Sequence, residues 1–144
     1  MTNVSVHAIV AGADAAAHWY CDVLGAQEQS RITLPDGRLI DVHLALGPTE
    51  LVLADEFPQH GALAPTAGVA PSAVFYLHVD DVDVVWNRAV AAGAEVVRPL
   101  QDAFWGEREG QITDPYGYRL GLTQHLRDVS PDEKAKGAAA QFGM

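Results

Sequence analysis

Histidine, tyrosine and arginine side chains recur at alternate positions of several short segments, a spacing that could build a polar ligand pocket. His7 and His43 are candidate general bases, because an imidazole titrates near neutral pH. Arg119 could hold a carboxylate or phosphate through two parallel hydrogen bonds. The candidate ligand-binding residues are Ser5, His7, His43, Tyr76, His78, Phe104, Trp105, Arg119 and Thr123.

Two further interpretations of these residues compete. Phe104 and Trp105 could stack on an aromatic or cationic ligand, or could fill a cavity mouth as core residues. His7, His43 and His78 would suit a transition metal, or could be hydrogen-bonded walls of a polar pocket. No short spacing such as His-x-x-x-His links any two of them. We therefore expect a polar pocket rather than a metal centre.

Composition excludes several classes of partner. The 144 residues carry a formal net charge of −10, which is a poor match to nucleic acid or an anionic membrane. The single cysteine, Cys21, rules out an internal disulfide framework. No apolar run approaches about 18 residues, and residues 1–10 lack the pattern of a signal peptide. These features predict a cytoplasmic globular protein that binds neither nucleic acid nor a membrane.

The elements that must position the candidate residues are short and repeat once. The turn signal Asp114–Gly117 precedes a strand over 119–125, whose polar face carries Arg119 and Thr123 and whose apolar face must pack on helices or another sheet. The segment Glu107–Glu109 is typical of a solvated turn. The expected strands are 4–11, 27–33, 38–46, 50–54, 73–79, 95–98, 108–113 and 119–125, and the expected helices are 14–24, 81–92 and a short one from Ser130.

This order predicts two strand-helix-strand-strand-strand units and an α+β fold class. The first unit covers 1–55 and the second 73–127. Prolines and glycines mark 56–72 as a linker, and 128–144 is a tail with a short helix. Each unit has a single helix to cover one face of its sheet, so the other face stays open unless the units curl around a common cavity.

The duplicated βαβββ pattern resembles the vicinal oxygen chelate superfamily, which includes glyoxalase I, extradiol dioxygenases, and bleomycin and fosfomycin resistance proteins. The resemblance covers roughly Ser5 to His125, and several motifs are similar to the PhnB-like branch. The motifs are Trp19-Tyr20, Leu24-Gly-Ala26, Leu53-Ala-Asp-Glu56, Phe104-Trp-Gly106, Asp114-Pro-Tyr-Gly-Tyr-Arg119 and Asp128-Val-Ser-Pro131.

The resemblance implies one domain over 1–127, a curved and partly open barrel, and a homodimer. It also implies a divalent metal held by four side chains, which fall here on Ser5, Val52, Val74 and Gly121. Valine and glycine side chains cannot coordinate a metal. We therefore expect no metal cofactor, with a rearranged site left open.

Two functions follow as hypotheses. The first is a binding protein that sequesters a small aromatic or cationic molecule, as the drug-binding resistance proteins of the superfamily do without a metal. The alternative is a lyase, isomerase or dioxygenase-like enzyme that uses a rearranged metal site or a general base, His7 or His43. A regulatory module is a third class that the sequence neither supports nor excludes.

Overall fold

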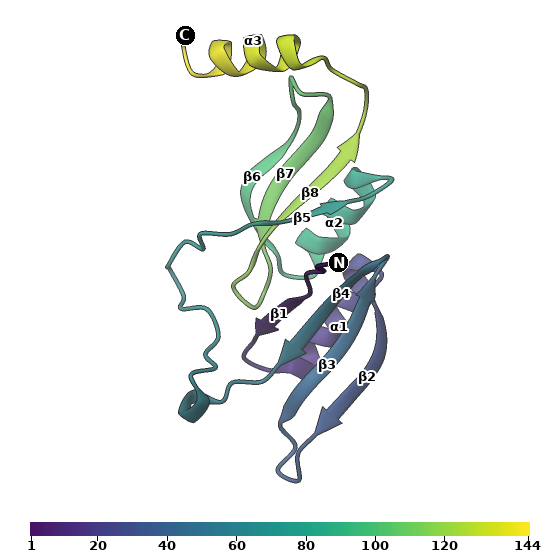
Figure 1. The fold of residues 1–144 in the computed structure, drawn as a ribbon, viewed down its shortest axis with the longest axis vertical. Helices are drawn as coiled ribbons and strands as arrows, with labels where there is room; N and C mark the ends of the chain where they lie inside the picture. The colour runs from purple at the N-terminus through teal and green to yellow at the C-terminus, as the bar shows by residue number, and fades with distance from the viewer. The chain divides into compact units, whose positions relative to one another are not determined.

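The computed structural model describes residues 1–144 and contains two open four-stranded mixed sheets, each with one helix against it (Figure 1). The chain divides into two compact units. Unit 1 comprises Met1–Pro71 with the turn Pro115–Tyr118, and unit 2 comprises Ser72–Asp114 and Arg119–Met144. The predicted α+β class and the duplicated βαβββ pattern are confirmed. None of the helices has the length and apolar character needed to span a membrane.

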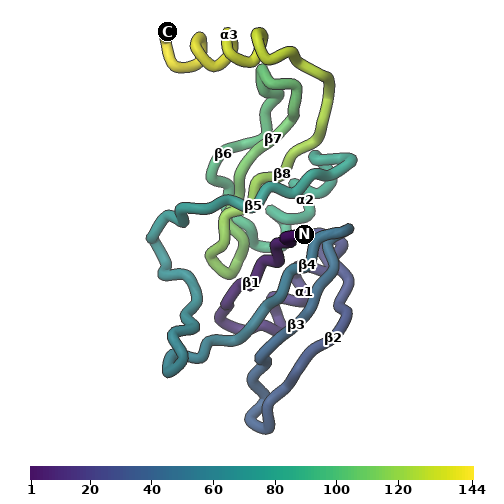
Figure 2. Tube along the Cα trace, in the orientation of Figure 1, coloured from purple at the N-terminus to yellow at the C-terminus, as the bar shows by residue number.

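Unit 1 has the strand order β1-β4-β3-β2, with β1 parallel to β4 and the other neighbours antiparallel. After β4 the chain runs through a 3-10 turn and a long strand-free segment before unit 2 begins, as the trace in Figure 2 shows. The elements are β1 (Val6–Ile9), α1 (Ala13–Leu24), β2 (Gln27–Thr33), β3 (Leu39–Leu46), β4 (Thr49–Ala54) and η1 (Pro58–His60).

Helix α1 forms because its buried residues recur at helical spacing and cover one face of the sheet. Gly25 ends the helix in the left-handed conformation, with φ 72°. The sheet residues that contact this helix are apolar and buried. Burial of such side chains favours folding. The fully or nearly fully buried residues of the two layers are Ala13, Ala16, Ala17, Trp19, Tyr20 and Val23 of α1, and Val42, Leu44, Leu51 and Leu53 of the sheet.

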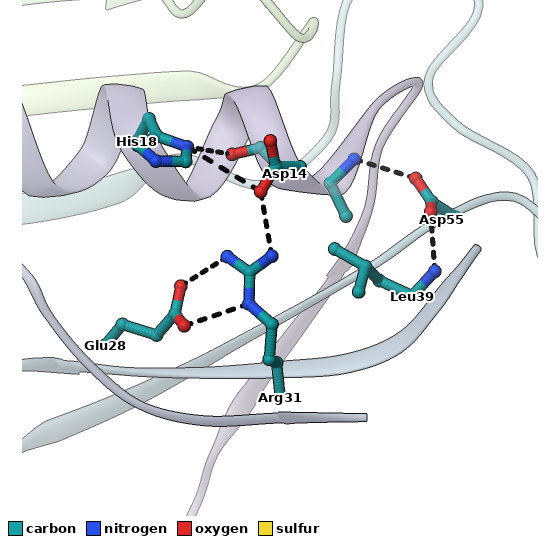
Figure 3. A network of polar contacts seen from close by, with 7 residues as sticks. Asp14, His18, Glu28, Arg31, Leu39 and Asp55 are labelled. Carbon is teal, nitrogen blue, oxygen red and sulfur yellow. Dashed lines mark hydrogen bonds and ion pairs between the residues drawn. The ribbon is translucent and has the colours of Figure 1, made fainter. Parts of the chain in front are cut away.

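The carboxylate of Asp55 holds the start of α1 to the sheet (Figure 3). Its Oδ1 accepts the backbone N–H of Ala13 at 2.7 Å, and its Oδ2 accepts the N–H of Leu39 at 2.7 Å. The residue in the usual capping position is Gly12, which has no side chain to offer. Asp55, which directly follows β4, therefore supplies the cap that Gly12 cannot.

A second polar group in Figure 3 connects α1 to the edge strand β2. The guanidinium of Arg31 donates to Asp14 at 2.8 Å and to both carboxylate oxygens of Glu28, at 2.6 and 2.9 Å. Hydrogen bonding to Arg31 lowers the pKa of both carboxyl groups. The group lies at the surface, where water and salt weaken ion pairs, so it orients the strand more than it stabilises the fold.

Unit 2 repeats the architecture in the order β5-β8-β7-β6 and adds a C-terminal helix. The side chain of Asp81 caps α2 by accepting the N–H of Val84 at 3.3 Å, and Ser130 caps α3 by accepting the N–H of Glu133 at 3.2 Å. The cap at Ser130 follows the sequence prediction of a short helix that starts there. The elements are β5 (Phe75–His78), α2 (Val82–Ala91), β6 (Glu95–Asp102), β7 (Glu107–Thr113), β8 (Arg119–His125) and α3 (Pro131–Gln141).

Each unit contains a hydrogen bond of the same kind between its helix and the end of its last strand, which the sequence did not suggest. The side chain of Gln124, near the end of β8, accepts the first N–H of α2, that of Val82, at 3.0 Å. Asp55, directly after β4, accepts the first N–H of α1 in the same way. In each unit the last strand of the repeat therefore fixes where the helix begins.

Several predicted bounds differ from the structure for identifiable reasons. The first strand is Val6–Ile9 rather than 4–11, and strand β6 runs to Asp102 through Pro99. Strand β6 lies at the sheet edge and has a register shift beside that proline, which is where proline is tolerated. A bulge before Thr33 also turns Leu39 inward, 3% exposed, and leaves Ile40 39% exposed.

Candidate functional site

The face of the unit 2 sheet that lies away from α2 is polar. The opposite face of the sheet is apolar and packs on α2, with Trp86 against Gly110. Strand register places Tyr76 beside Gly121, which in turn lies beside Gln111. Because side chains alternate along a strand, one face collects the polar set. Its members on β5, β7 and β8 are Tyr76, His78, Glu107, Glu109, Gln111, Thr113, Arg119, Thr123 and His125.

The ring of Tyr76 lies over Gly121. A Cβ placed on Gly121 would come within 2.4 Å of Tyr76 Cε1, a distance that no real side chain tolerates. Glycine is therefore required here for the ring to lie against the strand. The other side of the ring is open, since Tyr76 is 42% exposed.

The hydroxyl of Tyr76 is fixed by two donors. Gln111 Nε2 donates to it at 2.8 Å, and Arg98 Nη2 donates at 3.4 Å. Arg98 also donates to Glu109 at 2.7 Å, and Glu109 is only 4% exposed. Hydrogen bonding to Glu109 raises the pKa of Arg98 further above its ordinary value, so its guanidinium stays charged. An ion pair between the half-buried Arg98 and the buried Glu109 therefore anchors the tyrosine.

A second polar group occupies the His125 end of the same face. Glu107 accepts from Thr123 Oγ1 at 3.1 Å and contacts His125 Nδ1 at 3.0 Å. The other ring nitrogen of His125 lies 2.9 Å from Asp128. The hydrogen bond to Glu107, followed by that to Asp128, raises the pKa of His125. Glu107 is thus already engaged by protein groups.

Arg119 differs from the other charged residues of this face. It begins β8, lies beside Thr113 in the register and forms no ion pair. Its Nε is shielded from water and has no hydrogen-bond partner in the chain. Buried polar atoms of native proteins are nearly always hydrogen-bonded, so an unsatisfied one calls for an explanation.

The corresponding face of unit 1 carries the two predicted bases. Strand register aligns His7, Val52, His43 and Ser30 in one row across the sheet. His43 Nδ1 lies 2.5 Å from a carboxylate oxygen of Glu50. Both residues border an open hollow of about 270 Å³. Its lining is Gln29, Ser30, His43, Leu44, Ala45, Gly47, Pro48, Thr49 and Glu50.

The remaining candidates lie outside these two faces. Phe104 and Trp105 form the turn between β6 and β7, with their rings edge to face at 4.7 Å. Phe104 packs on α3, since a Cβ on Gly137 would lie 2.4 Å from its ring. Ser5 directly precedes β1. Of the predicted residues, the structure brings Tyr76, His78, Arg119 and Thr123 onto one face of unit 2, and His7 and His43 onto one face of unit 1.

Three residues that fix Tyr76 were missed from the sequence: Arg98, Glu109 and Gln111. The prediction of a solvated turn over Glu107–Glu109 is wrong, because strand β7 begins at Glu107 and buries Glu109. The period-two spacing of Glu107, Glu109 and Gln111 was a signal that could have found two of these residues.

The residues at the four metal-ligand positions that the resemblance implies do not fit a metal. Val52 is 1% exposed and apolar, and Val74 also lacks a donor atom. A longer side chain at Gly121 would meet the Tyr76 ring. Elsewhere in residues 1–144, no three His, Cys, Asp or Glu side chains gather in an arrangement suited to an ion.

Two duplicated βαβββ units, each with one polar sheet face, define the class of protein. The family model "Glyoxalase/Bleomycin resistance protein/Dioxygenase superfamily" matches residues 4–122. The chain belongs to this superfamily, which confirms the sequence-based resemblance.

The chain is also similar to known proteins and solved structures. The chain is 35% identical over 141 residues to the uncharacterized protein Mb0911c of Mycobacterium bovis, covering 96% of this chain and 93% of the relative. The crystal structure of TioX from Micromonospora sp. ML1 is 27% identical, with a TM-score of 0.66, and covers 88% of this chain and 100% of its own. The PhnB protein from Bacillus cereus shares the fold at 16% identity and a TM-score of 0.69, covering 85% and 99%.

Proposed function

We propose that this superfamily member binds a small aromatic molecule on the polar face of unit 2, without a metal, and acts by sequestering it. The supporting observation is Tyr76, whose ring is backed by Gly121 and whose hydroxyl is held by Gln111 and Arg98. A rigid, half-exposed aromatic ring offers a stacking surface at little conformational cost.

The sequence left open an aromatic or a cationic ligand, and the contacts of this face favour the aromatic one. Either ligand could lie on the Tyr76 ring. A cation would be favoured by a free carboxylate beside the ring, but Glu109 is paired with Arg98, and Glu107 with Thr123 and His125. An aromatic ligand needs only the ring and a few polar contacts.

The binding proposal is tested by a thermal-shift screen of small aromatic compounds, followed by affinity measurements on two variants. Tyr76→Ala should weaken binding of a screening hit by roughly tenfold to a hundredfold, since a stacked aromatic pair contributes about 1–3 kcal/mol including its buried area. Trp105→Ala tests the other aromatic candidate. Loss of affinity in Trp105→Ala with none in Tyr76→Ala would move the site to the β6–β7 turn.

We also propose that the protein works without a tightly bound divalent metal. The test is elemental analysis of protein purified without a histidine tag. We expect well under one Zn, Ni, Mn or Fe per chain. About one ion per chain, lost in His7→Ala, would overturn the proposal and favour an enzyme.

A second candidate function is general-base catalysis by His43. Glu50 at 2.5 Å from Nδ1 favours the tautomer in which Nδ1 is protonated and Nε2 carries the lone pair. Such a base could remove a proton from a small carbonyl substrate held in the adjoining hollow, as a lyase or isomerase requires.

The enzyme alternative can be assayed with the glutathione–methylglyoxal hemithioacetal in the presence of EDTA, which follows isomerisation without a metal. Turnover that falls by about 10²–10⁴ in His43→Gln would support His43 as the base. Equal turnover in His7→Gln and His43→Gln, or none in the wild type, would argue against it for this substrate.

We further propose that the protein is a cytoplasmic homodimer. The sheet edge strands β1, β2, β5 and β6 leave backbone groups that a second chain could cover. Sedimentation at tens of micromolar, about the range in which a weak dimer persists, measures the oligomeric state. A monomer at that concentration would contradict the proposal.

A further inference from the structure

We infer that the ligand of the unit 2 face carries a carboxylate, held by the hydroxyl proton of Tyr76 and the guanidinium of Arg119. This inference rests on the proposed binding function and specifies the ligand's chemical class. It follows from the two hydrogen bonds that the Tyr76 hydroxyl accepts and from the absence of an ion pair at Arg119.

The hydroxyl of Tyr76 has one donor proton and two acceptor lone pairs. Gln111 and Arg98 both donate to its oxygen and so occupy the acceptor positions. Neither of these groups can accept the hydroxyl proton, because both atoms facing it are donors. The proton of Tyr76 is therefore directed to a third partner, which must be an acceptor.

Arg119 is a cation without a counter-ion on the same face. It forms no ion pair, whereas Arg98 is paired with the buried Glu109. Its Nε is shielded from water and unpartnered. A guanidinium without a counter-ion in the chain is available to an anion from outside it. A guanidinium prefers a planar carboxylate, which accepts two parallel hydrogen bonds.

The two groups lie close enough to act on one ligand. Arg119 and Gly121 are two residues apart on β8 and point to the same face, about 7 Å along the strand. Tyr76 lies beside Gly121 in the register, with its ring over the glycine. A long arginine side chain spans this separation, so an aromatic ring on Tyr76 could present an acid group to both.

The two carboxylates of β7 on this face do not compete for these positions. Glu109 is paired with Arg98, and Glu107 with Thr123 and His125 at the far end of β8. The face therefore offers one unpaired cation, Arg119, and one obligate donor, while Glu95 of the edge strand β6, opposite Thr113, is an exposed carboxylate outside these pairs. This arrangement selects an anionic acceptor over a cationic ligand.

The test uses three matched probes: 1-naphthylacetate, its neutral amide and 1-naphthylmethylamine. Isothermal titration calorimetry on the whole chain should show the acid binding at least tenfold more tightly than the amide, with the amine weakest. A hydrogen bond to a charged group justifies this size of difference. The comparison needs no variant, so it does not depend on any substitution being tolerated.

Variants then assign the effect to residues. Arg119→Gln should weaken the acid by roughly tenfold and leave the amide nearly unchanged, and Tyr76→Phe should weaken the acid by roughly tenfold and the amide by less. Arg127→Gln is the matched control, because Arg127 is exposed and its ion pair with Glu133 is long, at 3.9 Å. It makes the same change of charge away from the face.

The outcomes separate the two proposals. Equal binding of acid and amide, or tightest binding of the amine, would overturn the carboxylate inference and leave aromatic binding intact. An acid preference that persists in both Arg119→Gln and Tyr76→Phe would also overturn it. Failure of all three probes to bind at millimolar concentration would count against both the inference and the proposed function.

Discussion

The ring of Tyr76 occupies the space into which a side chain at position 121 would project, with a Cβ on Gly121 predicted to lie 2.4 Å from Tyr76 Cε1. The pair thereby links two properties of the unit 2 face. It provides a backed aromatic surface, and it prevents residue 121 from presenting a donor atom. The same contact that builds the proposed ligand surface therefore removes one of the superfamily's metal-ligand positions.

This contact predicts that Gly121→Ala destabilises the protein by about 1–3 kcal/mol, the usual cost of forcing an extra carbon into a packed site. Urea unfolding measures the change. In a Tyr76→Ala background the ring is gone, and the cost of Gly121→Ala should nearly disappear. Additive effects of the two substitutions would show that the ring does not restrict position 121.

The fold was largely predictable because its signals are local. Apolar spacing, the helix ending at Gly25 and the capping residue Ser130 each specify an element without reference to the rest of the chain. Strand ends were less predictable. The bulge that buries Leu39 and exposes Ile40 depends on pairing between β2 and β3, which no single strand encodes.

The candidate site was predictable only in part. Alternation along β5 and β8 placed Tyr76, Arg119 and Thr123 on one face. The partners of Tyr76 come from other strands, and Arg98 lies at a register shift in β6. Which residues meet across a sheet is a matter of register, and one sequence without a structure does not fix it.

Asp55 is predicted to be a strong stabilising residue of unit 1. Asp55→Ala removes the acceptors of two backbone N–H groups, those of Ala13 and Leu39, and should cost about 1–3 kcal/mol. Asp22→Ala is the matched control, because Asp22 lies exposed on the same helix. Chemical denaturation compares the two variants. Equal stabilities would show that solvent replaces Asp55 at no cost.

His125 should make stability depend on pH. Its pKa in the folded protein lies above its ordinary value of 6.5, chiefly because of Glu107. The charged imidazole therefore stabilises the fold fully below about pH 6.5, and this contribution is lost as the pH rises through the folded pKa. The melting temperature of wild type should exceed that of His125→Gln most at about pH 6 and approach it in alkaline solution.

The carboxylates responsible can be ranked by the same measurement. Glu107→Gln should flatten the pH dependence more than Asp128→Asn does, because hydrogen bonding to Glu107 is the larger cause of the raised pKa. A melting-temperature difference between wild type and His125→Gln that stays constant from mildly acidic to alkaline pH would contradict the role given to His125.

Arg119 is expected to lower the stability of the ligand-free protein slightly. Arg119→Met retains the aliphatic stem and removes the guanidinium, whose Nε is shielded and without a partner. In the absence of ligand, the variant should therefore be as stable as wild type or more stable by about 1 kcal/mol, the order of the cost of one unsatisfied buried donor. Urea unfolding of the ligand-free proteins measures this difference.

In the presence of 1-naphthylacetate the order should reverse, because a ligand stabilises only the protein that binds it. A ligand-free Arg119→Met that is less stable by more than about 1 kcal/mol would instead assign Arg119 a structural role, since only a group with protein partners is missed when no ligand is present.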